Sequence, residues 1–309
     1  MKYTRLGALL LILAPLTLLL EGSLSQASGE EPGAADIRNP ILAGTWYPGN
    51  PDALKRMIRG LLSEATVEPP KGQLKALIVP HAGYRFSGHV AAHAYKLIES
   101  MPFRRVVLVG PSHRLSFRGV SVGLQSAYKT PLGLVPVDQS FAKSLLKAGA
   151  HVRWVPQAHS REHSLEIQLP FLQMVLKNFQ IVPILIGDQD FGASSRLAED
   201  LVRVMGDSEG SLLLASTDLS HFHSYERAKA LDGRFMKLLQ DLDPEGLAGS
   251  LASGSCEACG KGPALAVMLA AQKLAVNRAV ILKYANSGDV TGDHKEVVGY
   301  LSAALIKGE

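Results

Sequence analysis

Residues 75–84 read Lys-Ala-Leu-Ile-Val-Pro-His-Ala-Gly-Tyr, an aliphatic run that ends at a proline and is followed at once by His81. A short run without polar positions is typical of a strand whose two faces are both buried. Similar runs recur along the chain, and we predict buried strands at Leu77–Val79, Val106–Val109, Val182–Ile186 and Leu212–Ala215. Such strands predict a largely parallel sheet that is covered on both faces.

Helical patterns separate these runs. We predict helices at Val90–Ile98, Gln139–Lys147, Leu165–Lys177, Ser194–Met205, Tyr225–Gln240 and Pro263–Lys273. Strands that alternate with helices are typical of an α/β fold with helices on both faces of the sheet. The late runs Val280–Tyr284 and Val297–Ile306 have no clear helix between them. We therefore expect a mostly parallel or mixed central sheet, closed by an antiparallel pair.

Polar side chains follow each of the four buried strands directly. They are His81 after the first, Ser112 and His113 after the second, Asp188 after the third, and Asp218 and His221 after the fourth. In open α/β sheets the carboxyl ends of the strands form the ligand crevice. The sequence therefore predicts a site at this edge of the sheet.

The residue types at this edge favour a metal site. His81 and His113 offer two imidazole nitrogens, which suit zinc, copper, iron and nickel. Cys256 and Cys259 precede the predicted helix at Pro263, and a helix amino terminus stabilises a thiolate. Cys259 is nearer that helix, so we predict it as the third ligand. A disulfide between the two cysteines is the alternative.

Length and composition describe one globular domain. The chain has 309 residues, of which 47% are hydrophobic and 19% charged, and its formal charge is +4. That composition can bury a large core. So small a positive surplus, without a basic run, predicts no nucleic-acid partner.

The amino terminus carries an export signal. Lys2 and Arg5 precede an apolar run at Ala8–Leu20, and Ser25-Gln26-Ala27 supplies small residues for cleavage. We predict a signal peptide at residues 1–27, a disordered linker at 28–39 and one α/β domain at 40–309. The mature protein would be periplasmic or secreted, with no stable membrane span. An uncleaved anchor is the alternative, although the apolar run is short for a bilayer.

Seven stretches, in this order and spacing, resemble the Memo family, also called AmmeMemoRadiSam system protein B, from about Arg38 to Leu305. They are Ala43-Gly-Thr-Trp-Tyr-Pro48, Pro80-His-Ala-Gly-Tyr84 with Ser87-Gly88, Gly110-Pro-Ser-His113, Glu162-His-Ser-Leu-Glu166, Ser216-Thr-Asp-Leu-Ser-His221, Cys259-Gly260 with Pro263, and Val298-Gly-Tyr300. The resemblance implies a fold similar to LigB-type extradiol dioxygenases. It also implies one iron or copper ion on two histidines and a cysteine, which match His81, His113 and Cys259.

The same resemblance suggests further pocket residues. It places His221 as an acid/base group, Asp218 as its orienting partner and His163 as another pocket histidine. Trp46 and Tyr47 would wall the pocket. Each has a structural alternative: a helix cap for Asp218, a buried histidine for His163 and ordinary core for the aromatic pair.

Three functions fit these observations. A metal-dependent oxidoreductase of dioxygenase-like type is the first, with a small molecule or peptide in the pocket. The alternatives are a non-catalytic protein that binds a peptide or sequesters a metal, and a zinc-dependent hydrolase. Cys256 departs from the family pattern, and in an oxidising compartment its disulfide with Cys259 would compete with metal. The oligomeric state is not determined by the sequence.

Overall fold

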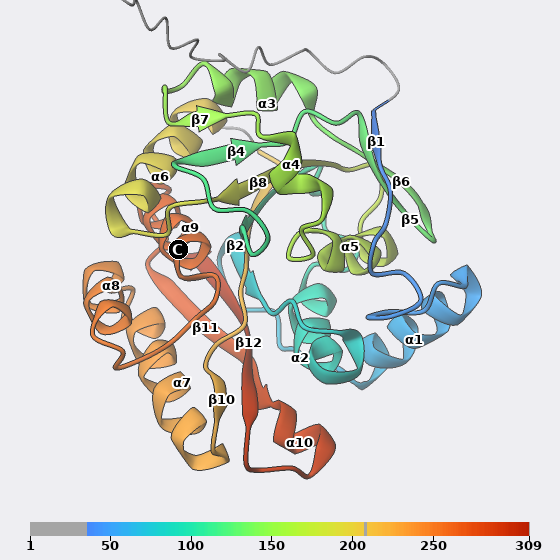
Figure 1. The fold of residues 1–309 in the computed structure, drawn as a ribbon, viewed down its shortest axis with the longest axis vertical. Helices are drawn as coiled ribbons and strands as arrows, with labels where there is room; N and C mark the ends of the chain where they lie inside the picture. The colour runs from blue at the N-terminus through green and yellow to red at the C-terminus, as the bar shows by residue number, and fades with distance from the viewer. Residues whose placement is uncertain (1–35, 207–208, 309) are drawn as a thin grey trace, which may run out of the picture. The chain divides into compact units, whose positions relative to one another are not determined.

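The computed structural model describes residues 36–206 and 209–308. The predicted signal peptide and residues 28–35 of the predicted linker lie outside these ranges. Within them, no helix combines the length and hydrophobicity that a membrane span requires. Figure 1 shows the arrangement of helices and strands.

A nine-stranded mixed sheet forms the centre of the domain. Its parallel part has the order β2-β9-β3-β8, made by β2 (Gln73–Val79), β9 (Ser211–Ser216), β3 (Arg105–Pro111) and β8 (Gln180–Ile186). Beyond β8 lie β4 (Val120–Val122), antiparallel to β8, and β7 (Val152–Arg153). Beyond β2 lies β12 (Val297–Lys307), which pairs antiparallel with β2, β10 (His221–His223) and β11 (Arg278–Asn286). The predicted strands and the late antiparallel pair are confirmed.

Each face of the sheet packs into its own hydrophobic core. Along β2, Ala76 and Ile78 pack with one core, whereas Leu77 and Val79 pack with the other. This alternation explains why the strand has no polar position. The helices with buried residues in the first core are α3 (Gln139–Leu146), α6 (Phe191–Met205), α7 (Tyr225–Gln240), α8 (Pro244–Ala252) and α9 (Lys261–Lys273). Those of the second are α1 (Pro51–Glu64), α2 (Tyr84–Leu97), α4 (Pro156–Ser160) and α5 (Leu169–Val175). Helices on both faces are therefore confirmed.

Three details differ from the sequence-based expectations. The predicted helix at Leu165–Lys177 is a short 3-10 helix, Glu166–Gln168, followed by α5, which already ends at Val175. The short helix α10 (Ser287–Thr291) connects β11 to β12. A second small sheet, which the sequence did not reveal, joins β1 (Ile37–Arg38), β5 (Ala127–Thr130) and β6 (Gly133–Pro136).

The predicted end of the linker at Asn39 is wrong, because the domain already includes β1. Arg38 is buried and forms an ion pair with the buried carboxylate of Glu166. Its guanidinium also donates to the carbonyl of Glu162, with an N–O distance of 2.6 Å. The Glu166 carboxylate accepts further hydrogen bonds from the Tyr47 hydroxyl, at 2.6 Å, and from the amide of Leu42, at 2.9 Å. Burial and these bonds fix β1 to the segment at residues 162–166.

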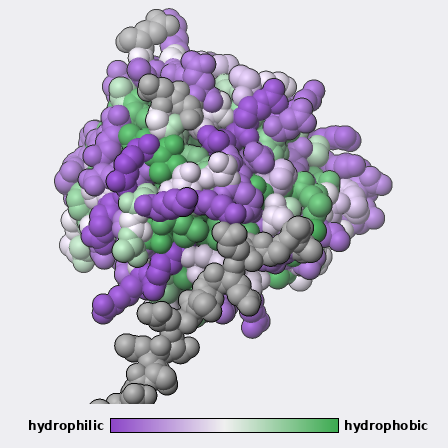
Figure 2. Space-filling model, turned by 90° about the horizontal axis from the view of Figure 1, so that it is seen from above, coloured by the Kyte–Doolittle hydropathy of each residue, from purple (hydrophilic) through white to green (hydrophobic). Residues whose placement is uncertain are grey.

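Few large hydrophobic side chains are exposed in the described part of the chain: Ile37, Ile41, Leu134, Phe222 and Val290. On the face drawn in Figure 2, hydrophobic patches are separated by hydrophilic side chains. Phe222 has the largest exposed fraction of the five, 70%.

The Arg38–Glu166 pair gives a first prediction. Arg38→Met should lower the free energy of unfolding by on the order of 3 kcal/mol, because it leaves a buried carboxylate without its counter-charge. Urea denaturation measures the loss. As a matched control, Lys237→Met removes an exposed pair with Asp241 and should cost less than about 1 kcal/mol. Equal losses in the two variants would show that Arg38 does not neutralise Glu166.

Candidate metal centre

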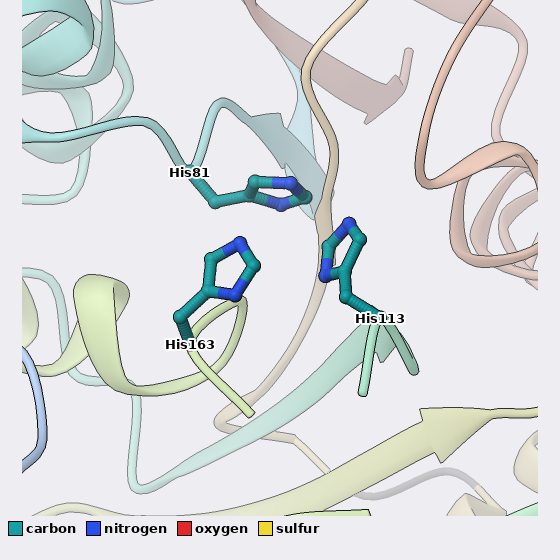
Figure 3. A group of neighbouring side chains, drawn as sticks. All are labelled: His81, His113 and His163. Carbon is teal, nitrogen blue, oxygen red and sulfur yellow. The ribbon is translucent and has the colours of Figure 1, made fainter. Parts of the chain in front are cut away.

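Three histidines from separate parts of the chain meet beyond the carboxyl ends of the sheet strands (Figure 3). His81 follows β2, His113 follows β3, and His163 lies just before the 3-10 helix at Glu166–Gln168. One ring nitrogen from each lies within 4.8 Å of the others. The ring centroids are 5.1 Å apart for His81 and His113, and 4.4 Å apart for His113 and His163. Side chains at this spacing can hold one metal ion.

Hydrogen bonds assign the proton of His81. Its Nδ1 lies 3.0 Å from the hydroxyl oxygen of Ser216. That hydroxyl already donates to the carbonyl of Ser164 and accepts from the side-chain amide of Gln168. The Ser216 hydrogen is therefore used, so Nδ1 of His81 must be the donor. Burial, followed by the nearby His113, lowers the pKa of His81 well below its usual range. The ring is then neutral, with the lone pair on Nε2, the form that metals bind.

Glu162 orients the second histidine. Its Oε1 lies 2.9 Å from Nδ1 of His113, and its Oε2 accepts from the His113 amide at 2.6 Å. Burial alone would raise the pKa of Glu162, but the hydrogen bond and charge of His113, together with His163 and the Ser164 amide, lower it to about 2. The carboxylate is therefore charged at neutral pH, and Nδ1 of His113 donates to it. A histidine held by a carboxylate in this way is the usual arrangement around metal ligands.

His163 completes the cluster. Burial lowers its pKa to about 4, only partly offset by Glu162, so the ring is neutral at neutral pH. Nδ1 of His163 lies 3.3 Å from Oε1 of Glu162, but this buried nitrogen has no hydrogen-bond partner among the described residues. A neutral imidazole beside the rings of His81 and His113 fits a metal ligand set.

Cys259 lies against the cluster through one contact, with Sγ 3.0 Å from Nε2 of His81. The side-chain amide of Gln189 donates to the Cys259 carbonyl at 3.0 Å, and the Gly260 amide donates to the Thr217 hydroxyl at 2.9 Å. These bonds hold the loop before α9. The structure thus groups His163 with His81 and His113, and Cys259 lies beside this group in contact with His81.

The state of the cysteines differs from the expectation. Burial, followed by the charge of Asp218, raises the pKa of Cys259 far above its usual range. The expected thiolate stabilisation by the helix is therefore outweighed, and Sγ is a thiol that can donate to His81. Cys256 is a free thiol packed in a hydrophobic core, and burial raises its pKa to about 11. It does not line the cavity, and no disulfide joins it to Cys259 in this structure.

A cavity of about 470 Å³ lies over the three histidines. Asp218, His221 and Cys259 also line it, together with Trp46, Ala82, Val298 and Tyr300. Asp218 accepts a hydrogen bond from the His81 amide at 2.7 Å, and burial raises its pKa to about 7. His221 directs Nδ1 to the Leu219 carbonyl at 2.8 Å, which leaves Nε2 unprotonated, and burial lowers its pKa.

Trp46 and Tyr47 lie in different environments. Trp46 lines the cavity, with its ring 4.8 Å from that of His163. Tyr47 is buried instead and donates to Glu166, so its prediction as a wall of the pocket is wrong. Glu162 and Tyr300 were not predicted as site residues. Both lie in stretches that carry the Memo resemblance, and that signal could have found them.

The chain is similar to known proteins along most of its length. The profile described as Memo-like protein matches residues 38–304. A MEMO1 family protein of Methanopyrus kandleri is 35% identical over 88% of this chain and 99% of its own length. One from Methanosarcina mazei is 37% identical over 88% and 99%. The crystal structure of an uncharacterized protein from Escherichia coli K12 covers 75% of this chain and 99% of its own, with a TM-score of 0.52 and 18% identity. That likeness concerns the fold alone.

Asp218 gives a prediction about pH. Its pKa is about 7 in the fold, against roughly 3.9 in an unfolded chain, so the native state alone holds this proton between about pH 4 and 7. Its stabilising contribution is present below about pH 4 and is lost as the pH rises through 7.

In metal-free protein, Asp218→Asn should therefore gain stability relative to wild type, by on the order of 4 kcal/mol between about pH 4 and 7. Urea denaturation at each pH measures the difference. The other shifted groups, including His163, occur in both proteins and cancel. A difference that does not vary with pH would contradict the raised pKa.

Proposed function

The chain belongs to the Memo-like family, and we propose that it binds one redox-active ion, iron or copper, at the three histidines and acts as a metal-dependent oxidoreductase. The observation that carries this proposal is that hydrogen bonds and burial already place the histidines in the orientation and protonation state that a metal ion requires. Nδ1 of His81 and Nδ1 of His113 are held by hydrogen bonds, to Ser216 and Glu162 respectively. Burial keeps His81 and His163 neutral. Such residues bind a metal without rearranging.

Iron and copper both accept imidazole ligands, and a thiolate favours copper further. When bound, such an ion would supply one-electron chemistry toward dioxygen or a substrate. Cys259, at 3.0 Å from Nε2 of His81, would join the ligands only after losing its proton, and a nearby cation lowers the pKa of a thiol. Metal binding that includes Cys259 would therefore release a proton.

Among the remaining cavity residues, some can exchange protons and others limit the access of water. Asp218, with a pKa of about 7, can hold or release a proton near neutral pH. Nε2 of His221 is free to accept one from a group in the cavity. Trp46, Val298 and Tyr300 form apolar walls, which limit the water in contact with these groups.

A zinc-dependent hydrolase is a second candidate, because three histidines below an open cavity also suit catalytic zinc. The metal retained after purification separates the two, since zinc has no redox chemistry. A protein that only sequesters metal would keep iron or copper without consuming dioxygen in the presence of a reductant.

The leader sequence supports a further part of the proposal, that the domain acts in a periplasm or outside the cell. Protein exported by the native host should have the intact mass of a chain that begins at Ser28. A mature chain that still begins at Met1 would exclude a soluble exported protein.

Substitution of the ligands tests the site. His81→Ala, His113→Ala and His163→Ala should each lose most of the bound metal, measured by elemental analysis after anaerobic purification, while circular dichroism stays unchanged. Glu162→Gln keeps every ligand but removes the carboxylate from His113, and metal affinity should fall by about 10- to 100-fold. His221→Ala is the matched control, because it removes a cavity histidine outside the cluster and should retain metal. Full metal occupancy in all three alanine variants would show that these histidines do not form the metal site.

The role of Cys259 is decided by the same measurement. Cys259→Ser should weaken binding if the thiol becomes a ligand, and the optical or electron paramagnetic resonance spectrum of the bound ion should change. An unchanged spectrum would leave the three histidines as the complete protein ligand set.

A further inference from the structure

Phe222 is an exposed aromatic residue at an unusual backbone position. It lies in β10 between His221 and His223, with 70% of its surface exposed. Its φ angle is +61°, in the left-handed region that a bulky side chain rarely adopts. An exposed ring gains little from burial, so packing does not explain why this residue occupies a strained position.

Bonds on either side hold the strained position. The pairing of β10 with β12 is irregular between His221 and His223, which indicates a β-bulge. Before the bulge, His221 is fixed by its bond to the Leu219 carbonyl. After it, Nε2 of His223 lies 2.9 Å from a carboxylate oxygen of Glu257, in the loop that carries Cys259. Strain that the neighbours maintain in this way is commonly found at functional sites.

The Phe222 ring packs against a residue that lines the cavity. It contacts His221 edge-on, with ring centroids 5.7 Å apart, and His221 lines the cavity. Trp46 and Val298 supply apolar wall on the same cavity. The three histidines and Asp218 supply polar lining. The cavity therefore offers a ligand both polar groups and apolar surface.

We propose that Phe222 is a specificity-determining contact for a small amphiphilic ligand, whose polar end reaches the histidine cluster and whose flat apolar body lies against the Phe222 ring. The part of this inference that concerns the polar end depends on the metal site of the proposed function. The bulge serves this contact, because it turns His221 toward the cavity while Phe222 remains exposed to an incoming ligand.

A first measurement concerns stability and needs no metal. Phe222→Gly and Phe222→Asn both remove the ring and tolerate a positive φ. Their melting temperatures should equal or exceed that of wild type, because the ring contributes strain and little packing. A fall of more than about 5 °C in both variants would show that the ring stabilises the fold, and would overturn the proposal.

The second measurement compares two probes on the copper(II)-loaded protein. Imidazole tests the polar end alone, and 4-phenylimidazole adds a flat apolar body. Titration followed by visible absorption should show that wild type prefers 4-phenylimidazole by about tenfold, the gain from removing roughly 55 Å² of apolar surface from water. The preference should fall to about twofold in Phe222→Gly and Phe222→Asn, while the affinity for imidazole stays unchanged.

Leu134→Ala is the matched control, because it removes another exposed hydrophobic side chain, on β6. It should keep the full preference for 4-phenylimidazole. A preference that persists in both Phe222 variants would overturn the role of Phe222 and leave the metal site standing. Failure of imidazole to bind wild type would overturn the open metal site and this inference with it.

Discussion

The buried carboxylate of Glu162 is the group on which the geometry of the site depends. It accepts hydrogen bonds from the amide and Nδ1 of His113, and from the amides of His163 and Ser164. One side chain thereby joins the end of β3 to the segment that carries His163. If either segment moved away, the buried Glu162 carboxylate would lose hydrogen-bond donors, and the free energy of the folded state would rise. The segments that carry His113 and His163 are therefore held in one arrangement.

Arg38 extends the same constraint to the first strand. Its guanidinium binds the Glu162 carbonyl and the Glu166 side chain, while Glu166 receives the Tyr47 hydroxyl. The segment at residues 162–166 is thus held from two sides by charge-assisted hydrogen bonds, which are stronger than neutral ones. A site that depends on ring positions within a few ångströms needs such a support, because loops alone do not provide it.

Burial also sets the protonation of the cavity. It lowers the pKa of His81, His163 and His221 and raises that of Asp218 and Cys259. Every one of these shifts favours the neutral form of its group, as expected where water is scarce. Glu162 is the exception, because its many donors stabilise the charge. The cavity is therefore lined largely by neutral groups, and one charged carboxylate, that of Glu162, contacts His113 and His163.

Local sequence patterns were enough to predict the fold class, the four parallel strands, the late antiparallel pair and the positions of His81 and His113 at the ends of β2 and β3. These features follow from local patterns, because a strand buried on both faces needs an uninterrupted apolar run, so that polar residues occur only after the strand ends. Contacts within the folded domain were needed to establish that His163 joins those two histidines, that Tyr47 and Cys256 pack in the interior, and that Arg38 belongs to the domain. Each of these depends on a contact between segments far apart in the chain, such as Arg38 with Glu166. Which polar group finds its buried partner is set by packing in three dimensions, and no local pattern contains that information.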